Sequence, residues 1–308
     1  MSILSKPYFH DTEAAFAKLE SILWADGSVC PHCGTVDHAY KITASTEKRV
    51  RYGLWKCGSK ECRKQFTVTV GTIFEGSKVP LYKWFQAVFL MVSSKKGISA
   101  NQMARTLEVT VKTAWLMGHR IREAMREGGP LDQMGGAGEI VEVDETFIGR
   151  EPGMEKRRAY HHKMKVLSLV QPGGKTRSMV VDNLSAKALV PILREQIDKE
   201  TVIFTDEAGQ YHHLKKDFAD HDIVRHGKKE YVRGEVHTNM IEGYFSIFKR
   251  GMKGVYQHCS KKHLHRYLAV FDFRYNNRAA LGLDDVQRAT VPMSAIAGSR
   301  LLYRDSFA

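Results

Sequence analysis

The chain has 308 residues, of which 43% are hydrophobic, so it is long and apolar enough to bury a core in one large domain or several smaller ones. That fraction excludes an intrinsically disordered protein. The net charge of +13 favours a polyanionic partner, most often nucleic acid; a basic surface without such a partner is the alternative.

The beginning of the chain lacks the pattern of a secretory signal, and the longest apolar run, residues 87–92, is too short to span a bilayer. We therefore expect a soluble, intracellular protein with no membrane partner. A helical segment is expected over residues 1–25.

Four of the five cysteines lie in two closely spaced pairs: Cys30 with Cys33, and Cys57 with Cys62. Two such pairs, about two dozen residues apart, can place four thiolates around one tetrahedral ion. The residues between and after the pairs alternate as in hairpin strands. The pattern predicts a zinc ribbon over residues 26–72 with structural Zn²⁺. Disulfides are the alternative, and an intracellular chain argues against them.

A helical pattern follows over residues 73–128. Ser99 can cap a short helix that ends near Leu107, and Thr110 can cap a second, basic helix. This is the layout of a helix-turn-helix DNA-binding segment, although generic helical hairpins share it. The residues of the second helix expected to face DNA are Lys112, Thr113 and His119.

A glycine-rich linker is predicted over residues 129–138, before a larger domain over residues 139–308. In that domain three successive strands, a helix, a fourth strand and further helices are expected. This order indicates an α/β fold with a mixed sheet flanked by helices, in the manner of ribonuclease H. The first and fourth strands each end in an acid, Asp144 and Asp206.

The stretch VHTNMIEGYFSIFKRG, residues 236–251, predicts an amphipathic helix. Its polar stripe consists of Asn239, Glu242, Ser246 and Lys249, and its other side is apolar from Met240 to Phe248. On the sheet, this helix could bring Glu242 or Asn239 against the two aspartates. Grouped carboxylates repel one another unless hard cations lie between them, which favours two Mg²⁺ or Mn²⁺ ions acting on a phosphodiester. Aspartates that only cap strand ends are the alternative.

Three blocks of this sequence resemble the signature of ISXO-like bacterial insertion-sequence transposases, a zinc-ribbon, DDE-type group. They are VDETFIG at Asp144, TDEAGQY at Asp206, and the stretch over residues 236–251; the similarity runs from Cys30 to about Arg278. The resemblance implies a multidomain protein with a zinc ribbon, a helical DNA-binding segment and a ribonuclease H-like domain. It implies a metal-dependent polynucleotidyl transferase that cleaves DNA at insertion-sequence ends and joins the 3′-hydroxyl to target DNA.

The resemblance also assigns residues. Asp144 and Asp206 would be the first two metal ligands, and Lys249 the basic residue beside the third. That group carries an acid or an asparagine at the third position; charge and reach favour Glu242 as the ligand, supported by Asn239. The residues expected to face phosphate are Lys249, Arg250 and Lys253, a solvated basic face being the alternative.

We therefore expect DNA, at transposon ends and target, to be bound by a homo-oligomer in the bacterial cytoplasm, associated with the nucleoid. The alternative from another functional class is a non-catalytic DNA-binding regulator derived from an inactive or domesticated copy. A nuclease that hydrolyses DNA without joining it is a third possibility.

Overall fold

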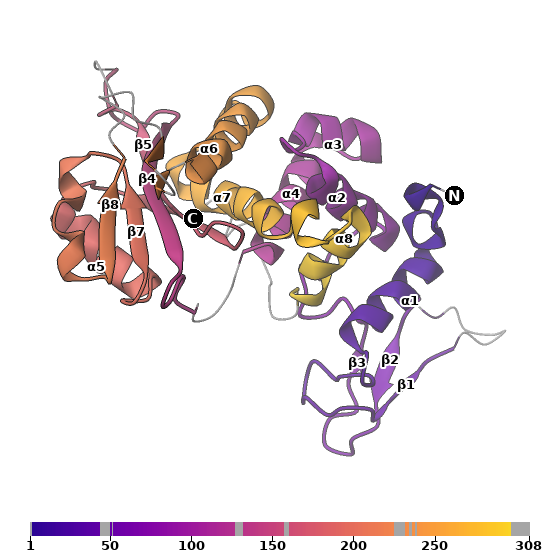
Figure 1. Ribbon diagram of the computed structural model, residues 1–308. Coiled ribbons are helices and arrows are strands. Elements are labelled where there is room, and N and C mark those ends of the chain that lie inside the picture. The colour runs from indigo at the N-terminus through magenta and orange to yellow at the C-terminus, as the bar shows by residue number, and fades with distance from the viewer. Residues whose placement is uncertain are drawn as a thin grey trace. The chain divides into compact units, whose positions relative to one another are not determined.

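The computed structural model describes residues 2–43, 50, 52–126, 132–156, 160–224, 232–233, 236–237 and 239–296. Its contacts divide the chain into two compact units, which are described separately (Figure 1). The first unit comprises residues 1–94, 98–125 and 282–308, and the second comprises residues 95–97 and 126–281.

The first unit begins with two short 3-10 turns, Ile3–Ser5 and Pro7–Phe9, and helix α1, Thr12–Leu23. A small antiparallel sheet follows in the order β1-β2-β3. Its strands are β1, Ala39–Lys41, β2, Trp55–Cys57, and β3, Gln65–Phe66. The predicted ribbon therefore has three short strands, and its cysteines lie at their ends and in the adjoining turns.

The rest of the first unit is helical: α2, Leu81–Ser93, α3, Ala100–Leu107, α4, Val111–Ala124, and α8, Asp285–Ser294. Both predicted caps are confirmed. Ser99 Oγ accepts a hydrogen bond from Gln102 N at 3.1 Å, and Thr110 Oγ1 accepts one from Thr113 N at 3.1 Å. Each cap satisfies a backbone donor that the first turn of its helix leaves unpaired. The use of this helix pair to recognise DNA stays a prediction.

The three residues proposed to face DNA differ in accessibility. Lys112 is exposed, and Thr113 is half-buried with its hydroxyl hydrogen-bonded to that of Thr110. His119 is 0% exposed, and its ring lies 4.1 Å from that of Trp115. The prediction that His119 faces DNA is therefore wrong, because that side of α4 packs into the core of the unit.

Helix α8 extends the first unit beyond the predicted boundary. It contacts α1, α2 and α4, and Arg288 Nη1 donates to the carbonyl of Val92 at 3.5 Å. Residues from 282 onward therefore belong by their contacts to the first unit, whereas the sequence placed them in a domain over residues 139–308.

The second unit contains a five-stranded mixed sheet in the order β6-β5-β4-β7-β8. Its strands are β4, Ile140–Ile148, β5, Met164–Val170, β6, Thr176–Val181, β7, Val202–Thr205, and β8, Asp220–Ile223. Strands β4, β5 and β6 pair antiparallel, while β7 is parallel to both β4 and β8. The predicted mixed sheet is confirmed; its ribonuclease H-like nature stays a prediction.

The remaining elements of this unit lie between and after these strands. They are α5, Ala186–Gln196, the 3-10 turns Gly209–Tyr211 and Leu214–Lys216, and the hairpin of β9, Val232–Arg233, with β10, Val236–His237. They continue with α6, Asn239–Gly251, a π-helical turn, Met252–Tyr256, α7, Lys261–Asn276, and a 3-10 turn, Ala279–Leu281.

Each face of the sheet has its own core. Side chains alternate along a strand, so Val141 and Val143 of β4 face one side, where they pack with Leu189 of α5. Ile148 of β4 packs on the other side with Phe248 of α6 and with residues of α7. Figure 1 shows α5 on one side of the sheet and α6 and α7 on the other. The even-numbered residues of β4 therefore face α6.

The described part of the predicted linker is packed. Met134 is 4% exposed, belongs to the core on the α5 side and forms a bridge with Ile197. Gly135 has a φ of +85°, and a Cβ atom there would lie 2.2 Å from Thr201 Oγ1. Residues 132–138 thus pack against the second unit as they lead into β4. Residues 127–131 lie outside the described part.

A partly buried polar network joins α6 and α7 to the sheet. Ser178 of β6 donates from its Oγ to Asp272 Oδ1 at 2.8 Å and from its backbone N to Asp272 Oδ2 at 2.9 Å. The Tyr244 hydroxyl of α6 also donates to Asp272 Oδ1, and Ser168 Oγ lies 2.8 Å from Ser178 Oγ. Burial and the Asp272 carboxylate raise the pKa of Tyr244 well above its usual value, so the phenol stays protonated.

We expect Tyr244→Phe to weaken the attachment of α6 to the sheet. Because Asp272 would lose a buried hydrogen-bond donor, the free energy needed to open α6 should fall by about 1–3 kcal/mol. Hydrogen exchange of α6 amides is the suitable measurement. Tryptophan fluorescence would not report on α6, because all four tryptophans (Trp24, Trp55, Trp84 and Trp115) lie in the first unit. The control is Tyr160→Phe in the same unit, whose side chain is exposed. Equal protection of α6 in both variants would contradict the anchoring role.

Candidate active site and metal centre

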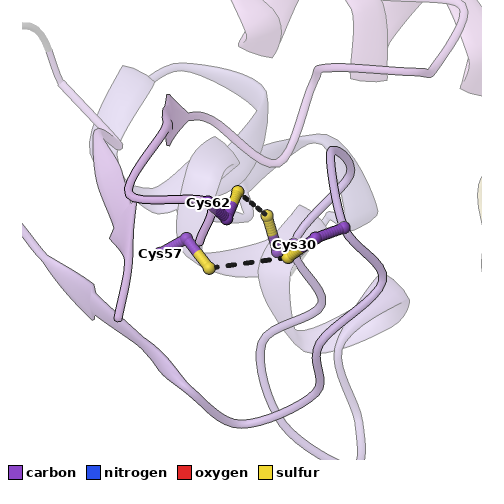
Figure 2. Close-up of side chains that lie close together, drawn as sticks. Cys30, Cys57 and Cys62 are labelled. Atoms are coloured by element: carbon purple, nitrogen blue, oxygen red, sulfur yellow. Dashed lines mark hydrogen bonds between the residues drawn. The ribbon is translucent and has the colours of Figure 1, made fainter. Parts of the chain in front are cut away.

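The four predicted zinc ligands meet at one point. Figure 2 shows Cys30, Cys57 and Cys62 turned toward one another, and the Sγ atoms of all four cysteines lie within 4.8 Å of each other. The Sγ atoms of Cys30 and Cys62 are 3.8 Å apart, and those of Cys33 and Cys57 are 3.7 Å apart. A tetrahedron with zinc–sulfur bonds of about 2.3 Å has edges of about 3.8 Å. The donor set and its spacing therefore fit Zn²⁺.

The ribbon fold brings these thiols together through its turns. Cys57 ends β2 and is buried, and Cys30 is buried in the turn before β1. All five cysteines are free thiols, so the disulfide alternative finds no support in their geometry. The fifth, Cys259, lies in the second unit and belongs to no metal-ligating cluster among the described residues.

Strand register aligns the two predicted catalytic aspartates. In the parallel pairing of β4 with β7, Ile140 is opposite Val202 and Glu142 is opposite Phe204. The same offset of 62 places Asp144 level with Asp206, one residue past the end of β7. Both aspartates lie an even number of residues from these partners, so both face α6. Adjacent strands are about 4.8 Å apart, which brings the two carboxyl groups together.

Asp144 lies within its strand, which corrects the prediction that the strand ends there. Pairing with β5 continues four residues further, to Ile148 opposite Met164. Pairing with β7 stops earlier, at Glu142, so Asp144 is free of a strand neighbour on that side. The Asp206 carboxylate accepts a hydrogen bond from Ala208 N at 3.0 Å, which holds the turn after β7.

Sequence reasoning missed Glu142, which fixes the start of α6. Its side chain is 0% exposed on the α6 side of β4, and its Oε2 accepts a hydrogen bond from Ile241 N at 2.8 Å. A carboxylate at a helix N-terminus pairs with a free backbone donor and with the positive end of the helix dipole. The alternation of β4 places Glu142 on the same face as Asp144, but only the tertiary fold reveals its partner.

The polar stripe of α6 lies where the sequence predicted. Glu242, Asn239 and Ser246 are exposed, whereas Ile241, Tyr244, Phe245 and Phe248 are buried. Met240 is an exception to the predicted apolar side, at 38% exposed. Lys249 is half-buried in the last turn, with its Nζ 5.8 Å from the centre of the Phe245 ring.

The structure brings some of the predicted site residues together and not others. Charge on Asp206 and on Lys249 influences the ionisation of Asp144, which places these three groups near one another. Glu242 does not join Asp144 and Asp206 in a compact three-ligand group of the kind that the cysteines form, as judged over the described residues. Arg250 and Lys253 are exposed beyond Lys249.

Burial and like charge perturb the site. Burial, and next the charge of Asp206, raise the pKa of Asp144 to about 7. Burial also raises the pKa of the neighbouring Glu145, which accepts a hydrogen bond from Gln210 Nε2. Tyr211 is fully buried, and burial together with the Glu145 carboxylate raises its pKa well above the usual value. The site thus holds more negative charge than its surroundings stabilise.

Two protein families match the chain: an ISXO2-like transposase domain over residues 136–276 and a transposase zinc-ribbon domain over residues 10–65. Residues 136–276 thus belong to the ISXO2-like transposase domain family, and residues 10–65 to the transposase zinc-ribbon family. An uncharacterized protein in transposable element ISH50 of Halobacterium salinarum is 27% identical over 277 residues, which cover 83% of this chain and 88% of that protein. An uncharacterized transposase-like protein of Haemophilus influenzae is 25% identical over 103 residues, 33% of this chain and 82% of that protein.

Among solved structures, the crystal structure of a pre-cleavage Mos1 transpososome matches 71% of this chain and 78% of that chain. The TM-score is 0.29 and the sequence identity 12%. The two family matches confirm the resemblance to ISXO-like transposases. The roles of individual residues in this transposase stay predictions.

We expect the purified transposase to contain one zinc ion per chain, held by the four cysteines. Cys57→Ser should lose the ion and perturb tryptophan fluorescence, because Trp24 and Trp55 pack against the cysteine cluster. The matched control is Cys259→Ser, which removes a thiol outside the cluster and should retain zinc. Elemental analysis of both variants is the measurement, and equal zinc contents would rule out this centre.

The raised pKa of Asp144 predicts a pH-dependent effect on stability. A carboxyl group with a pKa near 3.8 when unfolded and about 7 when folded stabilises the fold below about pH 4, and this contribution is lost as the pH rises through 7. Without divalent metal, Asp144→Asn should therefore stabilise the second unit at pH 8, and its advantage should shrink toward pH 4. Asparagine retains the Oδ1 that accepts from Glu145 N at 2.6 Å.

Thermal unfolding followed by far-ultraviolet circular dichroism at pH 8, 6 and 4 measures this effect. Asp206→Asn serves as a second variant: it removes one cause of the raised pKa of Asp144, so the stability change with pH should move to lower pH. An Asp144→Asn protein that is less stable than the wild type at pH 8 would contradict the electrostatic account.

Proposed function

We propose that this protein binds insertion-sequence ends, cleaves phosphodiester bonds there with divalent metal, and joins the freed 3′-hydroxyl to target DNA. The observation that carries the proposal is the level placement of Asp144 and Asp206 on one face of the sheet, beneath α6. The family match supports it, since the matched region, residues 136–276, includes both aspartates and α6.

The residues present fit a hard divalent cation. Asp144 and Asp206 offer anionic oxygens, which Mg²⁺ and Mn²⁺ prefer, and a cation between them would remove the repulsion that raises the pKa of Asp144. When bound, a pair of such ions activates an attacking hydroxyl and stabilises the leaving oxygen of a phosphodiester. Burial around Asp144 excludes water and strengthens every charge interaction at this point.

The third ligand is proposed to be Glu242, with Asn239 in support. Both lie in the first turn of α6, which Glu142 and Tyr244 attach to the sheet. Glu242 supplies a full negative charge and a longer side chain, whereas Asn239 offers only a carbonyl dipole. Lys249, whose charge acts on Asp144, would hold a DNA phosphate beside the carboxylates.

The remaining parts of the proposal concern partners and location. The exposed Lys112, Arg250 and Lys253 and the net charge of +13 support binding to DNA at transposon ends and target. Binding by a homo-oligomer is a further part of the proposal. None of the described helices combines the length and apolar character needed to span a bilayer. A nucleoid-associated place in a bacterial cytoplasm belongs to this proposal.

We expect Asp144→Asn and Asp206→Asn each to lower the rates of cleavage and joining in Mg²⁺ by orders of magnitude. DNA binding should survive, because the lost negative charge binds the metal ions and not the DNA. Glu242→Gln should reduce joining strongly, and Asn239→Ala should reduce it less. The measurement is transfer of a labelled element end into plasmid, with and without Mg²⁺. Ser246→Ala, on the same exposed stripe of α6, is the matched control.

Three other outcomes of this assay would each lead to a different conclusion. A wild type that binds DNA but neither cleaves nor joins would favour the non-catalytic regulator. Cleavage without joining would favour a nuclease. Loss of joining in Asn239→Ala that exceeds the loss in Glu242→Gln would assign the third ligand to the asparagine.

A further inference from the structure

A cavity of about 450 Å³ lies in the second unit, and its lining includes Lys249, whose charge acts on Asp144. It is formed by the end of β4, the start of β5, and the junction of α6 with the π-helical turn, Met252–Tyr256. Its charged lining consists of Lys163, Lys249 and Lys253, and among the described residues no acidic side chain lines it. Three cations thus surround one hollow, and α6 connects it to the candidate active site.

Lys163, Lys249 and Lys253 differ from two neighbouring lysines in their ion pairing. Lys165 and Lys261 both form ion pairs with Glu151, and Lys261 also pairs with Asp182. Within the part of the chain that the structure describes, no ion pair involves Lys163, Lys249 or Lys253. Desolvation lowers the pKa of Lys249, as do the charges of Lys253 and Lys163, while Asp144 opposes this shift. An anion in the cavity would relieve the repulsion among the three.

The other half of the lining is apolar. Phe147, Met164 and Met252 contribute to it. The Phe147 ring is stacked on that of Tyr160, with centroids 4.2 Å apart and planes 21° apart. The volume lies within the range of about 300–1,000 Å³ of pockets that hold organic ligands, which is more than a phosphate group alone requires. A ligand that fills this cavity needs an anionic part and a flat apolar part.

We propose that this cavity binds one unpaired nucleotide of the DNA strand held at the active site, with its phosphates on the three lysines and its base against Phe147 and the methionines. The inference rests on the proposed function, because it takes DNA as the ligand. Phosphate contacts by lysine are not sequence-specific, and aromatic rings accept any base face. The pocket is therefore expected to select an unpaired nucleotide regardless of its base.

The first test concerns the phosphates. Binding to a DNA duplex of arbitrary sequence that carries a single unpaired nucleotide is measured over a series of salt concentrations, without divalent metal. The double variant Lys163→Gln/Lys253→Gln should lower the magnitude of the slope of log K against log salt by about 1 to 2, about one unit per lost contact. The matched control is Lys165→Gln. It removes a lysine that is paired with Glu151, and Glu151 keeps its ion pair with Lys261, so the slope should equal that of the wild type.

The second test concerns the base. Two duplexes are compared, one fully paired and one with a single unpaired nucleotide. The wild type should bind the second at least about tenfold more tightly, because an unpaired base has little stacking left to lose. Phe147→Leu, which keeps the apolar volume but removes the ring, should lose most of this preference and keep the wild-type salt slope. Equal melting temperatures show that the variants are folded.

The outcomes separate the inference from the function on which it rests. A wild type that binds no DNA overturns both. DNA binding with equal slopes for the double variant and Lys165→Gln overturns only the inference, since joining of element ends is measured independently. A reduced slope without preference for an unpaired nucleotide also overturns it, because the cavity would then hold only the DNA backbone.

Discussion

The parallel pairing of β4 with β7 is the constraint on which the candidate active site depends. Three residue pairs fix the offset between the strands, and that offset brings Asp144 beside Asp206 although 61 residues separate them in the chain. Because side chains alternate along a strand, a slip of one residue would turn one aspartate toward the α5 side. The apolar residues around them prevent such a slip: Val141, Val143 and Ile203 must all remain in the core on the α5 side.

Helix α6 supplies the second half of the site, and buried polar contacts hold it in place. Ile241 and Phe248 pack it against the sheet, but apolar packing alone tolerates small shifts along the helix axis. Glu142 fixes its first turn through a directional hydrogen bond, and Tyr244 fixes the next through Asp272. Asp272 and Asn276 of α7 also pair with backbone groups of β6, the edge strand of the sheet. The same side chains therefore protect a free strand edge and hold the site together.

The sequence predicted what local chemistry decides. The caps at Ser99 and Thr110 depend on one side chain and a nearby backbone donor, and the cysteine spacing depends on two tight turns. The strands and the amphipathic face of α6 follow from their periodicity. The burial of His119, the packing of Met134 and the attachment of α8 to the first unit depend on contacts between distant segments. Glu142 carried no local signal that could distinguish it from Glu139 or Glu145 in the same acidic strand.

Two groups of like charges lower the stability of the second unit. Asp144 and Asp206 repel each other, and three lysines lie around one cavity with no acidic partner among the residues that the structure describes. Lys165 and Lys261, by contrast, are paired with Glu151. Each arrangement raises the free energy of the isolated protein, and the two cores and the Tyr244–Asp272 network must offset it. A divalent cation would neutralise the first group and a phosphodiester the second. Because the two groups lie close together, each ligand would favour binding of the other, and a cation joined to a phosphate matches both at once.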